Sequence, residues 1–290
     1  MGKLNYLVRS AIRATTAARL ACPNCHETRS ILVERKYGVT ALRRCSSCLM
    51  MYRTPNDDPA EAAIFYNDAY TQGFTTDCPA PDELDRLKAT DFAGQHNDYS
   101  YYISVLRDLG AGPSLFDFGC SWGYGSYQFA KAGFDVRSYE ISKPRAAYAA
   151  ANLGVRLVPS VEEWAEAHPH SVDVFFSSHV LEHVPSPSAV IKAAQRLLKP
   201  GGLFVAFFPN GSAAARARNP QWSQLWGQVH PNFLDDIFLN DAATDRPRLF
   251  GSSPVKISPQ TSEWLTSTAP SAALYVNGMQ EWEMFFAFRA

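Results

Sequence analysis

The sequence predicts an α/β protein built on a mostly parallel sheet, with a small cysteine-rich module ahead of it. Three observations carry this prediction. Residues 115–142 read as an apolar strand, a glycine-rich turn, a helix and a second apolar strand. Residues 171–210 read as another strand, helix and strand. Near the start of the chain, two Cys-x-x-Cys pairs bracket a hairpin pattern.

Residues 115–142 predict a βαβ unit with a ligand site at the carboxyl ends of its strands. The first strand ends at Asp117, the turn contains Gly119 and Gly123, a helix follows over 124–132, and the second strand ends on Glu140. Glycines let a ligand approach the backbone closely, and an acid in the last position can accept hydrogen bonds from both ribose hydroxyls. The pattern therefore implies a cofactor that carries adenosine.

A dinucleotide is disfavoured as this cofactor. The G-x-G-x-x-G fingerprint read from Gly123 would place its third glycine at Gln128. Asp117 would also put a negative charge near a pyrophosphate. A carboxylate at that position suits a cationic ligand instead.

These residues resemble motif I of the class I S-adenosylmethionine-dependent methyltransferases, whose pattern is acid-x-Gly-x-Gly-x-Gly with an acid at the end of the next strand. Asp117, Gly119 and Gly123 match the motif, and Glu140 matches the ribose-binding acid. Ser121 stands where the middle glycine usually is, and we expect negative φ there, which serine tolerates. The resemblance implies that these five residues bind S-adenosylmethionine.

The segment 171–210 resembles the fourth strand, following loop, helix and fifth strand of the same superfamily, down to its Lys-Pro-Gly-Gly turn at 199–202. The resemblance is close over 111–210 and looser elsewhere. It implies a Rossmann-like class I methyltransferase sheet that is mostly parallel, with an antiparallel last strand at 282–289. It also implies an enzyme that uses S-adenosylmethionine.

The fourth predicted strand delivers three polar side chains to the carboxyl edge of the sheet, where ligands of such folds bind. They are His179, Glu182 and His183, of which we expect His179 to contact the cofactor. The H-E-x-x-H order of a metal-binding helix is absent, and Pro185 and Pro187 interrupt any helix. A metal site is therefore not predicted here.

Four cysteines predict a structural zinc site. Cys22 and Cys25 form one pair, Cys45 and Cys48 form the other, and the strand-like hairpin lies between the pairs. Two such pairs can bring four thiolates to the corners of a tetrahedron, as Zn²⁺ requires, and four ligands leave no open position for chemistry. Disulfides are disfavoured without a secretion signal, and a redox pair needs only one Cys-x-x-Cys.

The remaining segments complete a predicted organisation. Residues 1–20 form a basic helix, 21–53 a zinc ribbon, 54–110 a linker and helices over the cofactor cleft, and 111–290 the methyltransferase domain. We expect one long helix from Asp82 to Leu109, a third strand at 155–158, a short helix at 161–167, and a loop-rich region over 241–278. A minor alternative brings Tyr66 or Tyr70 into the active site.

Composition restricts the partners. The 290 residues are 46% hydrophobic and 19% charged, with a net charge of −1, which offers nucleic acid no general attraction. No apolar run reaches the roughly 18 residues of a membrane span. We expect a cytoplasmic protein, with weak peripheral contact to anionic lipid through residues 1–20 as an alternative to packing of that helix on its own protein.

The combination of a zinc ribbon with this domain resembles the sugar methyltransferases of deoxysugar and polysaccharide pathways. In those enzymes, histidines after strands four and five line the substrate pocket. His183 and His230 match those places, and the resemblance implies that they are the catalytic residues, with His230 the preferred base. Val229 replaces the glutamate that precedes the second histidine, and the large C-terminal domain of the C-methylating members is missing. O- or N-methylation of a sugar, nucleotide-sugar or glycan is therefore expected ahead of C-methylation.

Two other functions stay open at this point. One is a zinc-ribbon RNA methyltransferase, against which the near-neutral charge argues. The other is a catalytically silent subunit that binds S-adenosylmethionine, against which the intact Asp117 and Glu140 argue.

Overall fold

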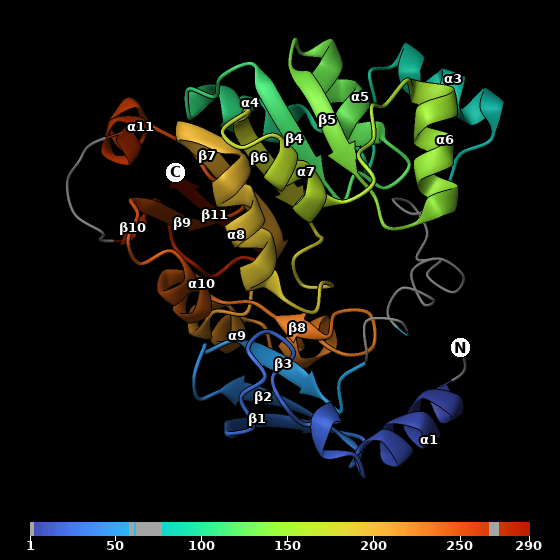
Figure 1. The fold of residues 1–290 in the computed structure, drawn as a ribbon, viewed down its shortest axis with the longest axis vertical. Helices are drawn as coiled ribbons and strands as arrows, with labels where there is room; N and C mark the ends of the chain where they lie inside the picture. Colours follow the sequence, from blue (N-terminus) through green and yellow to red (C-terminus); the bar gives the residue numbers. More distant parts are fainter. Residues whose placement is uncertain (1–2, 58–60, 62–76, 267–272) are drawn as a thin grey trace.

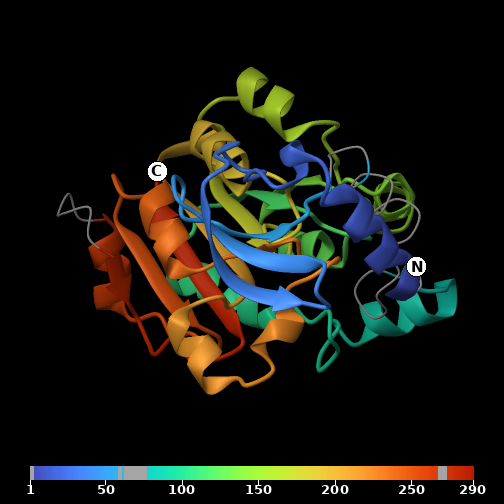
Figure 2. The same cartoon turned by 90° about the horizontal axis from the view of Figure 1, so that it is seen from below.

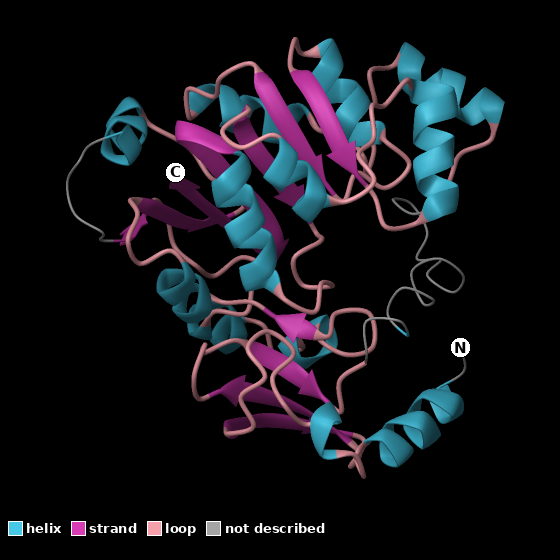
Figure 3. Ribbon diagram, in the orientation of Figure 1, coloured by secondary structure: helices cyan, strands magenta, loops and turns pink. Residues whose placement is uncertain are grey.

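The computed structural model describes residues 3–57, 61, 77–266 and 273–290. Within them the chain forms a large sheet between two layers of helices and a smaller sheet below it (Figures 1 and 3). Helices α7 and α8 cover one face of the large sheet, and α4 and α5 cover the other (Figure 1). The predicted α/β fold is confirmed.

The elements have the following bounds. The helices are α1 Lys3–Arg13, η1 Ala17–Arg19, α3 Pro81–Ala89, α4 Ser100–Asp108, α5 Tyr124–Lys131, α6 Lys143–Leu153, α7 Val161–Ala167, α8 Pro187–Leu197, α9 Ala213–Arg218, η3 Trp222–Leu225, α10 Asp236–Ala242 and α11 Pro259–Thr266. The strands are β1 Ser30–Lys36, β2 Thr40–Cys45, β3 Met51–Thr54, β4 Ser114–Phe118, β5 Asp135–Tyr139, β6 Val172–Ser178, β7 Leu198–Pro209, β8 Asn232–Phe233, β9 Arg248–Ser252, β10 Ala273–Tyr275 and β11 Glu283–Arg289.

The large sheet has the strand order β10-β9-β11-β7-β6-β4-β5. Strands β5, β4, β6 and β7 run parallel to one another, whereas β11 runs antiparallel to both β7 and β9. The predicted antiparallel last strand is thus confirmed. Because the parallel strands end at one edge, the residues that follow β5, β4 and β6 lie side by side there.

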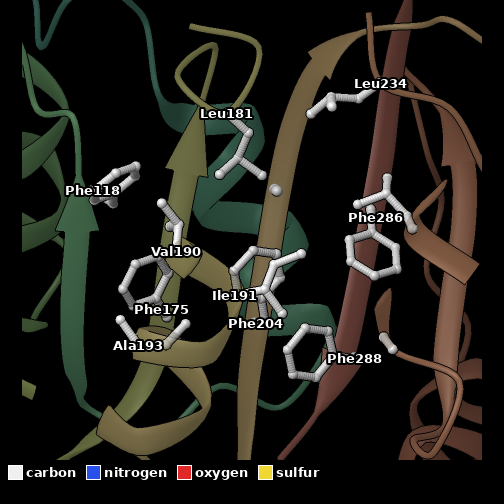
Figure 4. Close-up of a cluster of buried hydrophobic side chains, with 14 of the residues drawn as sticks. Phe118, Phe175, Leu181, Val190, Ile191, Ala193, Phe204, Leu234, Phe286 and Phe288 are labelled. Atoms are coloured by element: carbon white, nitrogen blue, oxygen red, sulfur yellow. The ribbon is translucent and has the colours of Figure 1, made fainter. Parts of the chain in front are cut away.

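Successive side chains along each strand point to opposite faces of this sheet, and each face carries its own hydrophobic core. In β7, Phe204, Ala206 and Phe208 belong to the core under α8, and Val205 and Phe207 belong to the core on the opposite face. Figure 4 shows the first of these cores, with side chains from α8 lying over those of the strands. Burial on both faces explains why the strands are almost continuously apolar.

The small sheet joins segments from the two halves of the chain. Its strand order is β1-β2-β3-β8, so a two-residue strand from the C-terminal half completes a sheet made by residues 30–54. The Arg53 amide donates a further hydrogen bond to the Pro231 carbonyl at 2.7 Å. Seen from below, the small sheet lies across the lower end of the large one (Figure 2).

Side chains fasten the cysteine-rich segment to the rest of the molecule. Asn24 accepts from the Ser186 hydroxyl at 3.0 Å and donates to the Ser188 hydroxyl at 2.9 Å, at the start of α8. Arg44 forms an ion pair with the fully buried Asp235 carboxylate at 2.5 Å. Asp235 also accepts from the Phe238 amide and so caps α10.

Three expectations about local structure were wrong. The long helix over 82–109 is two helices, α3 and α4, separated by a turn in which Asp91, Phe92 and Gly94 have positive φ. The third strand at 155–158 is reduced to one bridge, between Ser138 and Leu157. The region 241–278 contains β9, which is buried and pairs with β11 in the middle of the core.

The N-terminal helix is present as α1, but two arginines of the basic segment 1–20, one in α1 and one in η1, are engaged within the protein. Arg13 pairs with Asp57 at 2.5 Å and with Glu61 at 2.9 Å, and Arg19 pairs with Glu61 at 3.1 Å. No helix among the described residues has both the length and the apolar character needed to cross a membrane. Tyr66 and Tyr70 lie outside the described residues. The division into four segments stays a prediction.

The Arg44–Asp235 pair supplies a stability test. Replacing Asp235 with Ala leaves Arg44 without its buried partner and removes the α10 cap, so we expect a loss of roughly 3 to 5 kcal/mol in the free energy of unfolding, measured with urea. The matched control is Glu166→Ala, which breaks the exposed pair with Arg196 and should cost less than about 1 kcal/mol. Equal losses in the two variants would contradict this account.

Candidate functional site

A cavity of about 540 Å³ opens at the carboxyl edge of the large sheet. Gly119 follows β4, Glu140 follows β5 and His179 follows β6, and all three line the cavity. Because β5, β4 and β6 are neighbours in that order, the sheet topology itself brings these residues together. His183 and His230 line the same cavity, so most of the sequence-predicted residues meet here.

A glycine is required at position 119 because Val180 approaches its backbone closely. The φ of Gly119 is +83°, and a Cβ built on this residue would lie 2.3 Å from Cγ2 of Val180. A side chain would therefore push the turn after β4 away from the loop after β6. The missing side chain allows the two loops that line the cavity to touch.

Glu140 is held in place by two backbone donors. Its Oε2 accepts from the Ser121 amide at 2.9 Å and its Oε1 from the Ser142 amide at 2.8 Å. Each oxygen keeps a second lone pair for a ligand in the cavity. Burial raises the pKa of the Glu140 carboxyl, against the lowering effects of these amides and of Arg145.

Ser121 departs from the expected backbone conformation. Its φ is +51°, in the left-handed region, whereas we expected a negative value. A residue with a side chain pays a conformational cost of roughly 1 kcal/mol or more there. The hydrogen bond from the Ser121 amide to Glu140 holds this conformation.

Asp117 and Gly123 support the turn from beneath and are not part of the cavity wall. The Asp117 carboxylate is buried, and its Oδ2 accepts from the Ser126 hydroxyl at 2.6 Å. Burial raises the pKa of Asp117 to about 7. Gly123, with φ of +91°, begins α5 where a Cβ would lie 2.8 Å from both Ala149 and Val155.

His179 lies between two carboxylates. Its Nε2 is 2.7 Å from Oε1 of Glu283 and its Nδ1 is 3.5 Å from Oε1 of Glu182, while its ring stacks on Trp282. Burial lowers the pKa of His179, but the two carboxylates outweigh this effect and raise it to about 10. Although a third of the side chain is exposed, His179 is therefore a fixed cation at neutral pH.

A second cavity, of about 560 Å³, adjoins the first and shares Tyr124, Ser178 and His179 with it. Its other walls include aromatic rings and the Glu283 carboxylate, which accepts from the Tyr102 hydroxyl at 3.1 Å and from Ser253. The further aromatic lining residues are Tyr99, Tyr101, Tyr102 and Trp282. Flat rings with hydroxyl groups at their edges suit a ring-shaped, hydroxylated ligand.

His183 and His230 meet with their ring centroids 4.8 Å apart. Nδ1 of His183 lies 2.7 Å from the Val229 carbonyl, and Nδ1 of His230 lies 2.9 Å from the Leu225 carbonyl. Glu182, which is fully buried, lies beside them with its Oε1 3.7 Å from Nε2 of His183. Burial lowers the pKa of His183 to about 4, so this ring is neutral.

The four predicted cysteine ligands also come together. The sulfurs of Cys22 and Cys48 are 3.6 Å apart, those of Cys25 and Cys45 are 3.5 Å apart, and all four lie within 4.8 Å of one another without a disulfide. Tetrahedral Zn²⁺ with Zn–S bonds of about 2.3 Å separates its sulfurs by about 3.8 Å. The spacing fits that metal.

Comparison with known proteins agrees with this geometry. Residues 116–206 match a family model described as a methyltransferase domain. The chain therefore contains a methyltransferase domain. The matched region holds Asp117, Gly119, Glu140, His179 and His183, so the domain includes both loops that line the cavity.

Curated relatives are named ubiquinone biosynthesis O-methyltransferase. That of Sodalis glossinidius is 38% identical over 97 residues, which cover 31% of this chain and 39% of the relative. That of Xanthomonas euvesicatoria is 35% identical over 122 residues, covering 40% and 51%. The chain thus spans about half of these relatives or less. The names of these relatives therefore do not point to the sugar methyltransferases that the sequence resembles.

A solved structure shares the fold. It is the plantazolicin methyltransferase BpumL in complex with a monoazolic desmethylPZN analogue and SAH, with a TM-score of 0.50 and 13% identity over 79% of this chain and 93% of that one. At this identity the likeness concerns the fold alone, and it confirms the predicted class I methyltransferase architecture.

Sequence reasoning missed two residues that shape the site. They are Glu283, which the sequence places in the last strand, and Tyr102, which it places in a helix. One signal was present, because Glu283 is an acid at the start of the apolar strand EMFFAFR. Tyr102 carries no such signal, since aromatic residues on a helix normally pack in a core.

The buried Asp117 carboxyl supplies a test by pH. Its folded pKa is raised from an unfolded value of about 3.9 to about 7, so the stability it contributes is present below pH 4 and is lost as the pH rises to 7. Asn keeps an acceptor for Ser126 and does not titrate. Relative to wild type, Asp117→Asn should therefore gain on the order of 1 to 3 kcal/mol in the free energy of unfolding between pH 5 and pH 8.

Urea unfolding of both proteins at the two pH values gives this difference. Contributions from all other titrating groups cancel in the comparison. Parallel pH profiles for the two proteins would show that Asp117 is already ionised at pH 5.

Proposed function

We propose that this protein transfers a methyl group from S-adenosylmethionine to a hydroxyl oxygen of a small molecule. The observation that carries the proposal is one cavity that is lined both by Glu140 and His183, from the region matched to a methyltransferase domain, and by His230, from beyond that region. A group that suits a ribose and groups that suit a hydroxyl therefore face the same space.

The cofactor part rests on Gly119, Ser121 and Glu140. Gly119 and Ser121 line the cavity at the turn after β4, and the oriented Glu140 carboxylate offers one lone pair on each oxygen to the two ribose hydroxyls. When bound, S-adenosylmethionine supplies a methyl group on a sulfonium. The residues of this chain contribute alignment of that group with the acceptor.

The acceptor part rests on the histidine pair. Two imidazoles held by backbone carbonyls beside a carboxylate can orient a hydroxyl and assist the loss of its proton. The names of the relatives favour oxygen as the methylated atom. The acceptor class stays broad: the sequence resemblance favours a sugar, nucleotide-sugar or glycan, and the aromatic second cavity equally suits a phenol.

We also propose that Cys22, Cys25, Cys45 and Cys48 hold a structural Zn²⁺. Their sulfur spacing supports this, and four thiolates leave the metal no open position. The metal would brace the small sheet, because Cys45 ends β2 and Cys48 precedes β3.

The function is tested by incubating the purified protein with S-adenosylmethionine and a panel of nucleotide-sugars, glycans and phenols. We expect S-adenosylhomocysteine and a methyl ether from at least one hydroxylated class. His230→Ala should lower kcat by roughly 10²- to 10⁴-fold and change cofactor affinity by less than about twofold, because His230 acts on the acceptor. Absence of S-adenosylmethionine binding, or tighter binding of NAD, would overturn the assignment.

Glu140→Ala tests the cofactor end of the cavity. Loss of a charged acceptor in a buried position costs roughly 1.5 to 3 kcal/mol, so the affinity for S-adenosylmethionine should fall by about tenfold or more. Calorimetry measures this, with the exposed Glu166→Ala as the control that keeps wild-type affinity. Unchanged binding by Glu140→Ala would remove this residue from the cofactor site.

The zinc proposal predicts about one tightly held Zn²⁺ in freshly purified, reduced protein, detected by elemental analysis. Cys48→Ser should release that metal and expose the small sheet to proteolysis, since the folding of such modules depends on the metal. The exposed Cys78→Ser is the matched control and should keep both metal and resistance. A metal-free wild type that resists proteolysis would refute the proposal.

A further inference from the structure

Three residues beside the cavity form a second group with the composition of a metal site. Glu182, His183 and His230 each offer one ligand atom, and these atoms all lie within 4.8 Å of one another. Glu182 and His183 come from the loop after β6, and His230 comes from the segment before β8. Sequence spacing could not reveal the group, because its third member lies 47 residues beyond His183.

The backbone fixes which nitrogen of each histidine faces this group. A carbonyl oxygen can only accept, so Nδ1 of His183 donates to Val229 and Nδ1 of His230 donates to Leu225. With Nδ1 engaged in this way, Nε2 is the nitrogen through which each ring could bind a cation. Metal-binding histidines are typically oriented in this way, by a backbone carbonyl or carboxylate on the other nitrogen.

Glu182 adds a negative charge that the protein only partly compensates. Its side chain is 1% exposed, and neither carboxylate oxygen accepts a hydrogen bond from the described part of the chain. The nearest cation is His179, whose Nδ1 is 3.5 Å away, but its other nitrogen donates to Glu283 at 2.7 Å. The imidazole beside Glu182 is thus engaged more closely by Glu283, and the buried Glu182 carboxylate is left without a hydrogen-bond donor among the described residues.

The group is also held rigidly. The Asn232 amide donates to the Glu182 carbonyl at 3.1 Å, and its side chain donates to the Val184 carbonyl at 2.6 Å. These bonds clamp the loop on both sides of His183. Asn232 itself belongs to β8, two residues after His230, so one short strand aligns all three members.

We propose that Glu182, His183 and His230 form a binding site for one divalent transition-metal cation, with Zn²⁺ as the reference ion. Two imidazole nitrogens and one carboxylate are a donor set that Zn²⁺ and related ions accept while keeping open positions. Ligand atoms about 2.1 Å from a tetrahedral ion lie about 3.4 Å apart, so atoms that lie up to 4.8 Å apart need to approach by at most about 1.4 Å. The open positions face the cavity, because His183 and His230 both line it.

The site gives the histidines a specific task, in an argument that rests on the proposed methyl transfer. A hydroxyl oxygen that binds the cation at an open position becomes more acidic, as water does on bound Zn²⁺. The histidines then act on the acceptor as ligands of the cation. The location of the site does not depend on this role.

The competing arrangement has no metal, with His179 alone offsetting Glu182. Direct titration separates the two. Wild-type protein that carries its ribbon metal is dialysed against a weak chelator and titrated with Zn²⁺ in a calorimeter. We expect one further Zn²⁺ per chain, bound at least about tenfold more weakly by Glu182→Gln and by His230→Ala.

Three controls make the result decisive. His168→Gln removes an exposed histidine stacked on Trp164 and should bind Zn²⁺ like wild type. His179→Gln should also keep the second ion, and its loss there would overturn the ligand set. Glu182→Gln preserves shape, so it decides the case if His230→Ala fails to fold in thermal unfolding.

Cobalt distinguishes the two kinds of site spectroscopically. Co²⁺ at four thiolates gives intense sulfur charge-transfer bands, whereas the second ion should add only weak visible bands. A wild type that takes no second ion, or variants that bind it equally well, would overturn the proposal. If the protein binds the second ion but methylates no acceptor, the metal site stands and the proposed function is overturned. If the protein methylates an acceptor but binds no second ion, the function stands and the metal site is overturned.

Discussion

The contact between Gly119 and Val180 is the constraint on which the cavity depends. Strands β4 and β6 are neighbours, so the loops that leave them must share the space above the sheet edge. The absent side chain at Gly119 lets these loops meet at a distance that no Cβ permits. The turn after β4 can then support Glu140 through the Ser121 amide, while the loop after β6 carries His179, Glu182 and His183 into the same cavity.

The small sheet has a part in building the site although no residue of 30–54 lines the main cavity. Strand β3 pairs with β8, and the Arg53 amide bonds to Pro231, the residue directly after His230. Asn232 in β8 then bonds to the loop that holds His183. A chain of hydrogen bonds thus runs from the cysteine module to the histidine pair. The module therefore contributes to the position of His230 without touching a ligand.

Most of the fold could be predicted because local patterns and topology agree. Glycines, apolar runs and an acid after β5 specify the βαβ unit, and the parallel sheet then determines which loops meet. The division of the helix at 82–109 depends on a turn with positive φ at Asp91 and Phe92, for which the residue types give little warning. Strand β9 lies in a stretch rich in loops, and only its pairing with β11 makes it a strand.

The site was predicted less completely, for a reason that the three histidines illustrate. His179 faces two carboxylates and is held as a cation, with its pKa raised to about 10. His183 donates to a carbonyl and is held neutral by burial, and His230 donates to a carbonyl in the same way. His179 and His183 thus take opposite charge states because their surroundings differ: Glu283, at the start of β11, engages His179, and the Val229 carbonyl, from the segment before β8, engages His183. Those partners are more than 40 residues away from His179 and His183 in the chain, so the residue type and its neighbours in sequence specify where each imidazole lies but not what it can do.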